Sequence, residues 1–216
     1  MLQQLEKVLN RSGVSFFGSR EFLDFGCGTG RLAQLFSGYM PDAKLYGCDV
    51  KSYLVKRCAR LVPRGNFFVN GVVPPLDLED GSVDMVFAYS VFTHLKEDAH
   101  IQWLREFSRV LKKGGYAVLT THGYECLKRM RKFSPEKLKK YQIEDLDNFM
   151  VRKEQYYWVQ NLRKEPDYGL AVITDKYIRD NWMKVSGMEL KGYEPAAVEA
   201  YPEGCQDLVI LIKGNG

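Results

Sequence analysis

The sequence lacks any long run of apolar residues. No window approaches the roughly 18 apolar residues that a membrane-spanning helix requires. The N-terminal stretch MLQQLEKVLNRSG has no apolar core of the length found in signal peptides. We therefore expect a soluble, cytoplasmic protein without a membrane partner.

The cysteines lack the spacing of a disulfide or zinc framework. They number five, they are widely scattered, and none belongs to a CxxC pair. A disulfide-stapled fold and a zinc site are therefore not expected, and no other cluster of metal-ligating residues is visible in the sequence. Unpaired cysteines of this kind are typical of a reducing, intracellular compartment.

The sequence also lacks a strong excess of one charge. The formal net charge is +4 and the isoelectric point is about 8.7, which falls short of the basic field that makes nucleic acid the expected partner. A basic run extends from Lys128 to Lys140, but Glu144, Asp145 and Asp147 follow it and cancel much of its charge. The composition therefore does not predict a nucleic-acid partner.

The apolar pattern predicts one domain in which strands alternate with helices. A chain of 216 residues with 45% hydrophobic residues can bury a substantial core. A short amphipathic helix opens the chain. Strands are then expected at 21–25, 44–50, 66–70, 84–90 and 116–121, with helices at 32–38, 53–61 and 97–111. This alternation indicates right-handed βαβ units and a parallel sheet covered on both faces, so residues 1–122 are expected to form a Rossmann-like, cofactor-binding half.

The pattern changes after His122. Residues 123–170 are expected to form a helical cap inserted after the fifth strand, and regular α/β spacing returns in residues 171–216, with a helix at 175–185 and strands at 188–193 and 206–213. The complete fold is thus predicted to be a doubly wound, seven-stranded, mostly parallel sheet in a single domain. Within it, His100 is expected on the exposed side of its helix, and Tyr141 is expected to pack inside the cap.

Three glycines at alternate positions follow the first predicted strand, in FLDFGCGTGR (Phe22 to Arg31). A strand that ends in a glycine turn and leads into a helix places a ligand at the helix N-terminus. A P-loop would need GxxxxGK[ST] and a dinucleotide site would need GxGxxG, whereas this turn has GxGxG. A nucleoside with an uncharged or zwitterionic tail remains, and Asp49, at the end of the second strand, is placed to bind both ribose hydroxyls.

Four motifs in order give the sequence a family resemblance. FLDFGCGTGR, LYGCDV, VNGVVPPLDLEDGSVDMVFAYSVFTHL and REFSRVLKKGGYAVLTT resemble the successive motifs of class I S-adenosylmethionine-dependent methyltransferases, over roughly Arg20 to Thr121. The resemblance implies S-adenosylmethionine as methyl donor and S-adenosylhomocysteine as product. The C-terminal part is similar, less specifically, to small-molecule methyltransferases encoded with glycan-building enzymes, in which a helical cap covers the acceptor.

The resemblance also assigns cofactor-binding residues by position. In the family, the glycine turn packs on the methionine part of the cofactor, the acid after the second strand binds ribose, and the residue after the third strand contacts adenine. The corresponding residues are Asp24, Gly26, Cys27, Gly28 and Gly30 for methionine, Asp49 and Val50 for ribose, Asn70 and Gly71 for adenine, and Tyr89 and Ser90 beside the methyl group.

Two histidines are candidates for proton transfer. His122 follows the fifth strand and is predicted to act as a general base if the acceptor is a hydroxyl. His94, after the fourth strand, could cap the next helix, line the cofactor pocket or transfer a proton itself. We expect methyl transfer to a hydroxyl or amine of a small molecule, such as a sugar or glycan precursor. An RNA or protein methyltransferase that uses the basic insertion, and a non-catalytic regulatory protein that binds the cofactor, remain as alternatives.

Overall fold

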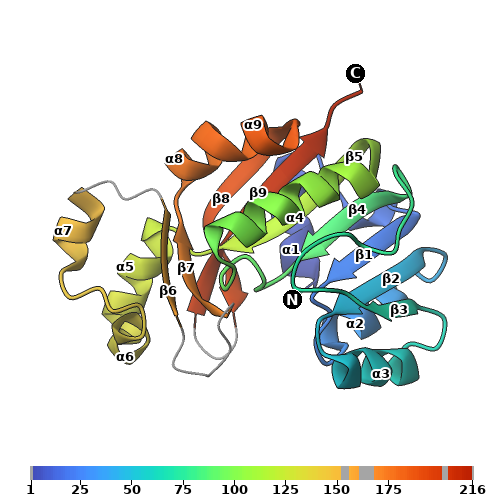
Figure 1. Ribbon diagram of the computed structural model, residues 1–216, viewed down its shortest axis with the longest axis horizontal. Helices are drawn as coiled ribbons and strands as arrows, with labels where there is room; N and C mark the ends of the chain where they lie inside the picture. The colour runs from blue at the N-terminus through green and yellow to red at the C-terminus, as the bar shows by residue number, and fades with distance from the viewer. Residues whose placement is uncertain (1, 152–155, 161–167, 201–203, 216) are drawn as a thin grey trace.

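The computed structural model describes residues 2–151, 156–160, 168–200 and 204–215. Its centre is a seven-stranded sheet in the order β3-β2-β1-β4-β5-β9-β8 (Figure 1). The strands are β1 (Glu21–Phe25), β2 (Lys44–Asp49), β3 (Asn66–Val69), β4 (Val83–Ala88), β5 (Leu111–Thr121), β8 (Met188–Ala200) and β9 (Gly204–Lys213). The first five pair in parallel, and β9 runs antiparallel to both of its neighbours. The predicted seven-stranded, mostly parallel sheet is confirmed.

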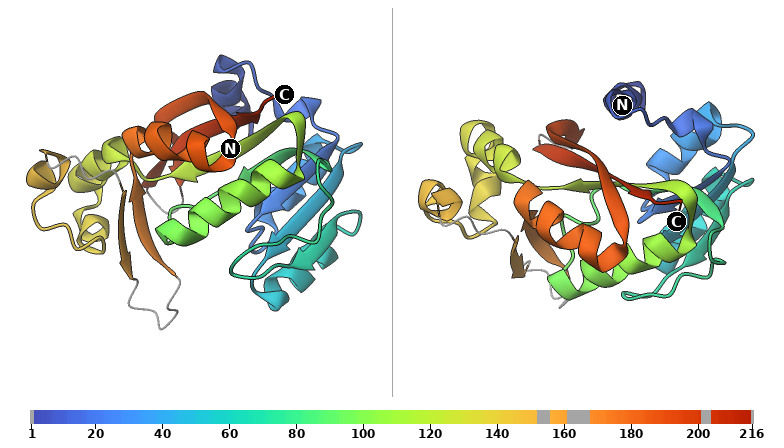
Figure 2. Two further views of the ribbon diagram at one scale, coloured as in Figure 1. Left: turned by 45° about the horizontal axis from the view of Figure 1, so that its top comes forward. Right: turned by 90° about the horizontal axis from the view of Figure 1, so that it is seen from above.

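Helices cover both faces of this sheet. They are α1 (Leu2–Arg11), the short 3-10 helix η1 (Phe16–Gly18), α2 (Arg31–Tyr39), α3 (Ser52–Leu61), α4 (Glu97–Val110), and the continuous helical segment α8 (Asp175–Tyr177), η2 (Ile178–Trp182) and α9 (Met183–Ser186). One buried cluster lies between the sheet and α1 with α2, and a second lies between the sheet and α4 with η2. Viewed from above, α1 lies on the opposite side of the sheet from α4 and α9 (Figure 2). The fold is therefore doubly wound.

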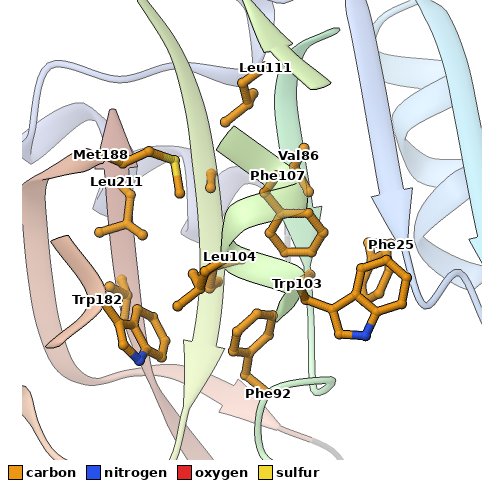
Figure 3. Packing of buried hydrophobic residues seen from close by; sticks show 14 of the residues in the cluster. Phe25, Val86, Phe92, Trp103, Leu104, Phe107, Leu111, Trp182, Met188 and Leu211 are labelled. Carbon is orange, nitrogen blue, oxygen red and sulfur yellow. The ribbon is translucent and has the colours of Figure 1, made fainter. Parts of the chain in front are cut away.

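The cluster under α4 is rich in aromatic rings (Figure 3). The Phe107 ring lies 4.9 Å from the Phe25 ring and 5.9 Å from the Phe92 ring, measured between centroids. Aromatic pairs in such arrangements stabilise the fold by more than their buried area alone provides. This core fixes α4, which begins directly after the loop that carries His94.

The prediction that His100 is exposed is wrong. Its side chain on α4 is fully buried, 5.2 Å from the Tyr156 ring and 5.8 Å from the Trp182 ring. Burial lowers its pKa to about 3, so the ring is neutral. The reason is that η2 and a later strand pack against the side of α4 that the apolar pattern leaves to solvent.

The insertion after β5 is part helical and part strand. It contains α5 (Tyr124–Phe133), α6 (Pro135–Lys139) and α7 (Leu146–Val151), followed by an antiparallel pair, β6 (Tyr156–Gln160) and β7 (Gly169–Ile173). The insertion is helical from α5 to α7. The expectation of helix is wrong for β6 and for the start of β7, and residues 152–155 and 161–167 of the predicted cap lie outside the described residues.

The β6–β7 hairpin lies between α5–α7 and the main sheet (Figure 1). Its side chains alternate between two cores, because successive residues of a strand point to opposite faces. Ala171 and Ile173 join the core under α4, whereas Val172 packs with Leu127 and Phe149 of the insertion helices. The three helices therefore share a small hydrophobic core of their own, which we call the cap core.

No helix in the described parts of the chain is long and apolar enough to cross a membrane.

Candidate cofactor and acceptor site

The turn between β1 and α2 adopts a backbone that needs glycine. Gly26, Gly28 and Gly30 all have positive φ angles, of 75°, 53° and 83°, a region that other residues rarely adopt. A Cβ atom on Gly26 would lie 2.5 Å from Cγ2 of Val91, whereas at Gly28 the nearest atom is 3.9 Å away. The turn is therefore packed on one side and open at Gly28.

Asp49 links this turn to the end of β2 through hydrogen bonds. Its Oδ2 accepts a hydrogen bond from the Gly28 amide at 3.1 Å, and its Oδ1 accepts one from the Lys51 amide at 2.9 Å. The Asn70 amide donates to the Asp49 carbonyl oxygen at 3.3 Å. The structure thus brings together the ends of β1, β2 and β3 that the sequence assigns to the methionine, ribose and adenine parts of the cofactor.

Two buried oxygens beside the turn have no hydrogen-bond partner among the described residues: Asp24 Oδ2 and Asn70 Oδ1. Burial, with a smaller contribution from the charge of Asp49, raises the pKa of Asp24 to about 7. Burying an ionised carboxylate without a partner costs free energy. The Asn70 amide oxygen can only accept a hydrogen bond, and the same holds for Asp24 Oδ2 when Asp24 is ionised. The site therefore fits a ligand that brings a cationic amine to Asp24 and an N–H donor to Asn70, as S-adenosylmethionine does with its ammonium and adenine groups.

Ser90 follows β4 in a strained backbone conformation, with φ of 57°. Its amide donates to Thr120 Oγ1 at 2.8 Å, and Gln206 Nε2 donates to its Oγ at 2.8 Å. Gln206, on β9, is almost fully buried. Sequence reasoning missed Gln206 because it lies 116 residues from Ser90. The preceding Tyr89 stacks on Phe87, with ring centroids 6.2 Å apart.

His94 lies in the loop between β4 and α4. Its Nδ1 lies 2.8 Å from the carbonyl oxygen of Gly169, and its ring stacks on Tyr168 with centroids 4.3 Å apart. Its own carbonyl oxygen accepts hydrogen bonds from the Gly169 amide at 3.1 Å and from Trp158 Nε1 at 3.2 Å. Burial lowers the pKa of His94. The ring is thus held by the β6–β7 hairpin.

His122 lies directly after β5 and is 8% exposed. Its Nδ1 lies 2.6 Å from the hydroxyl oxygen of Tyr141. Burial first, and the nearby His94 second, lower the pKa of His122 to about 3, so its ring is neutral at pH 7. The contact with Tyr141 was not predicted, since a single tyrosine in the charged segment EKLKKYQIED (136–145) gives no sign of a specific polar partner.

Backbone hydrogen bonds fix β7 to the segments that follow β4 and β5. The Ala171 amide donates to the Thr93 carbonyl oxygen at 2.8 Å, and the Ile173 amide donates to the His122 carbonyl oxygen at 2.9 Å. The element bound directly to these strand ends is therefore the hairpin, while the insertion helices pack on its far face. The two predicted catalytic histidines are joined by one strand.

A cavity and a search for metal ligands complete the description of candidate sites. An apolar cavity of about 230 Å³ is lined by α1, η1 and α2, with none of the predicted site residues among its walls. Across the described residues, no group of three or more His, Cys, Asp or Glu side chains could hold a metal ion.

Comparison with known sequences finds a methyltransferase-like region in the first part of the chain. A sequence model described as a methyltransferase domain matches residues 23–119, which run from β1 to β5. Trans-aconitate 2-methyltransferase of Afipia carboxidovorans is 26% identical over 100 residues, covering 45% of this chain and 36% of that protein. An uncharacterised protein of Streptomyces fradiae is 32% identical over 109 residues, covering 49% of this chain and 31% of that protein. The chain spans about a third of the length of these curated relatives.

Solved structures share the fold over nearly the whole chain. An S-adenosylmethionine-dependent methyltransferase from Methanosarcina mazei is 18% identical with a TM-score of 0.65, covering 90% of this chain and 92% of its own. Another from Mesorhizobium loti is 14% identical with a TM-score of 0.62, covering 96% of each. The motifs, the family match and the fold agree: residues 23–119 match a methyltransferase domain, and the chain shares its fold with solved S-adenosylmethionine-dependent methyltransferases.

Proposed function

We propose that the chain transfers a methyl group from S-adenosylmethionine to a hydroxyl or amine of a small molecule. The observation that carries the proposal is the pair of unpartnered oxygens, Asp24 Oδ2 and Asn70 Oδ1, beside a glycine turn that Asp49 fastens. A ligand with an ammonium group and an adenine amino group offers one donor to each oxygen.

In this proposal each strand end has one task. Asp24 accepts from the ammonium group, the remaining lone pairs of the Asp49 carboxylate accept from ribose hydroxyls, and Asn70 accepts from adenine. The open side of Gly28 admits the close approach of a ligand to the backbone. The cofactor supplies an electrophilic methyl group on a sulfonium, so much of the acceleration comes from holding the acceptor oxygen or nitrogen at attack distance.

The covering of β4 and β5 supports a small acceptor. The hairpin is hydrogen-bonded to the segments that follow β4 and β5. His122 is buried and His94 is partly buried. The basic run of the insertion is partly neutralised, because Lys128 pairs with Glu125 at 2.6 Å and Arg131 pairs with Asp147 at 2.9 Å. The curated relative from Afipia carboxidovorans is named for a small acceptor, trans-aconitate, which supports the same size class.

Calorimetry tests the cofactor, and a labelled methyl group tests the reaction. S-adenosylmethionine and S-adenosylhomocysteine are expected to bind in the micromolar range, and NAD is expected not to bind, because the turn has GxGxG and is followed by Asp49. Label should move from the cofactor to a low-molecular-mass fraction of hydroxyl and amine compounds. Preference for NAD, or transfer of label to RNA or protein only, would overturn the proposal.

A further inference from the structure

The two histidines at the strand ends are held in opposite tautomers. His94 Nδ1 faces the carbonyl oxygen of Gly169 at 2.8 Å. A carbonyl oxygen can only accept a hydrogen bond, so Nδ1 must carry the proton. The other ring nitrogen, Nε2, is therefore unprotonated and is a proton acceptor.

His122 has the reverse arrangement. Its Nδ1 faces the hydroxyl of Tyr141 at 2.6 Å. Burial raises the pKa of this tyrosine, so it keeps its proton. Within the described residues that hydroxyl has no other partner, and a buried O–H left unbonded is costly. Tyr141 therefore donates to Nδ1, and the proton of the neutral His122 ring sits on Nε2.

Both Nε2 atoms are available to a ligand. In the part of the chain that the structure describes, neither atom has a hydrogen-bond partner, and neither is among the buried polar atoms that lack one. Each Nε2 atom therefore keeps some solvent-accessible surface. The rings are close enough for His94 to lower the pKa of His122.

The backbone shows which side of the sheet His122 faces. Thr121 pairs with Asp207, and a Cβ atom on Gly123 would fall 2.1 Å from Asp207 Oδ2. Residues 121 and 123 thus point toward Asp207, so His122 points to the other side by strand alternation. That is the side of Thr120, which binds Ser90. His122 therefore lies on the same side of the sheet as Thr120 and Ser90, the latter predicted to border the methyl group.

We propose that His94 Nε2 takes the proton of an acceptor hydroxyl, while His122 Nε2–H donates to a carbonyl or carboxylate oxygen beside that hydroxyl, with Tyr141 fixing the His122 tautomer. The acceptor is then a compound whose hydroxyl neighbours a carbonyl oxygen, such as a 2-hydroxy acid. This inference rests on the proposed methyl transfer. It exchanges the roles that the sequence assigned to the histidines.

The transfer balances with these two groups alone. The hydroxyl oxygen forms a bond to the methyl carbon, and the bond from that carbon to sulfur breaks with its electron pair left on sulfur. The hydroxyl proton passes to His94 Nε2, where the Gly169 carbonyl stabilises the resulting imidazolium, and it then leaves to water. The products are a methyl ether and a thioether. His122 keeps its proton throughout and orients the acceptor.

Nitrogen NMR of the full chain, labelled with ¹⁵N-histidine, tests the tautomers directly. The chain has three histidines, which His94→Gln and His122→Gln variants assign. We expect the proton on Nδ1 in His94 and on Nε2 in His122. The same tautomer in both rings would overturn the inference, whether or not the protein methylates anything.

Tyr141→Phe tests the positioning role of the tyrosine. It should release His122 into a tautomer mixture and leave the His94 spectrum unchanged. Tyr157→Phe is the matched control, because the Tyr157 hydroxyl belongs to the same insertion and donates to the Tyr141 carbonyl oxygen at 2.9 Å. Tyr157→Phe should leave the tautomers of both His94 and His122 unchanged. A His122 spectrum unaffected by Tyr141→Phe would overturn the role of Tyr141.

Matched acceptors test the substrate class. Labelled methyl transfer is measured with mandelate, with phenylacetate, which lacks the hydroxyl, and with benzyl alcohol, which lacks the carboxylate. Only mandelate should be methylated, giving an ether stable to alkali, and His94→Gln should slow transfer about 10²–10⁴-fold with unchanged S-adenosylhomocysteine affinity. Methylation of either control, release of methanol by alkali, or no transfer to mandelate would overturn the assignment. Failure of S-adenosylhomocysteine to bind would instead count against the proposed function.

Discussion

Asp49 holds backbone amides from two segments with its two carboxylate oxygens, Gly28 on one and Lys51 on the other. Asp49→Ala removes these bonds and the proposed bonds to ribose, each contributing about 0.5–3 kcal/mol. Calorimetry should therefore show S-adenosylhomocysteine binding at least about tenfold more weakly. Asp42→Ala, at an exposed site before β2, is the control and should bind normally. Equal affinities for both variants would place the ribose elsewhere.

Asp24 makes the stability of the ligand-free protein depend on pH. Its pKa is raised from 3.8 to about 7 by burial, so the unfolded state loses this proton first as the pH rises. Below pH 3.8 the carboxyl is protonated in both the folded and the unfolded state and does not change the free energy of unfolding. Between pH 3.8 and about 7 the free energy of unfolding falls by up to about 1.4 kcal/mol per pH unit. In denaturant titrations, the free energy of unfolding of Asp24→Asn should therefore rise relative to that of the wild type as the pH increases across that range. A difference that does not change with pH would contradict this account.

The residues of the candidate cofactor site can be located from the sequence because they follow one another along the chain at strand ends. Asp24, Asp49 and Asn70 are each found by locating a strand and reading the next few letters. Gln206 and Tyr141 were not predictable in the same way. Each reaches its partner only after the chain has folded back on itself, and no local spacing encodes that contact.

At the scale of elements, the parallel strands were predictable and the hairpin was not. Strands β1, β2, β4 and β5 are apolar segments closed by glycine or polar turns, which identify buried strands. Strand β7 is apolar on both sides, because Ala171 faces the main core and Leu170 and Val172 face the cap core. With no alternation of apolar and polar residues, the pattern cannot separate this strand from a buried helix segment.

The hairpin depends on Gly169. A Cβ atom there would lie 2.2 Å from the Trp158 ring, and Trp158 in turn donates to the His94 carbonyl oxygen. Gly169→Ala should push the two strands apart, reduce stability by about 1–3 kcal/mol, and speed hydrogen exchange at the Ala171 and Ile173 amides.

The control for this prediction is Gly38→Ala, in α2, where the added methyl group would meet no atom within 4 Å beyond the adjacent residues and the helix backbone. It should leave exchange in the hairpin unchanged and slightly stabilise the helix. Cofactor affinity should be unchanged in both variants, since neither residue touches the glycine turn. Normal exchange in Gly169→Ala would mean that Trp158 can move aside without disturbing β7.

At the scale of the whole molecule, two cores hold the sheet and a third holds the insertion helices. The cores on the two faces of the sheet draw on strands from both halves of the sequence. The cap core instead joins α5, α6 and α7 to the outer face of the hairpin. The division of the chain into a cofactor-binding half, a cap and closing strands therefore predicts two levels of stability, because segments with few contacts to the main core open at lower free energy.

Two phenylalanines separate these levels. Phe107 is fully buried under α4, and Phe149 is 8% exposed in the cap core, where its ring lies 5.3 Å from that of Tyr157. Phe107→Ala should lower the free energy of unfolding of the whole domain by about 3–5 kcal/mol. Phe149→Ala should instead speed hydrogen exchange in α5, α6 and α7, with S-adenosylhomocysteine affinity and exchange in β1, β4 and β5 nearly unchanged. If Phe149→Ala destabilised the sheet as much as Phe107→Ala does, the insertion and the cofactor-binding half would be one cooperative unit, and the proposed cap would not open independently of the site it covers.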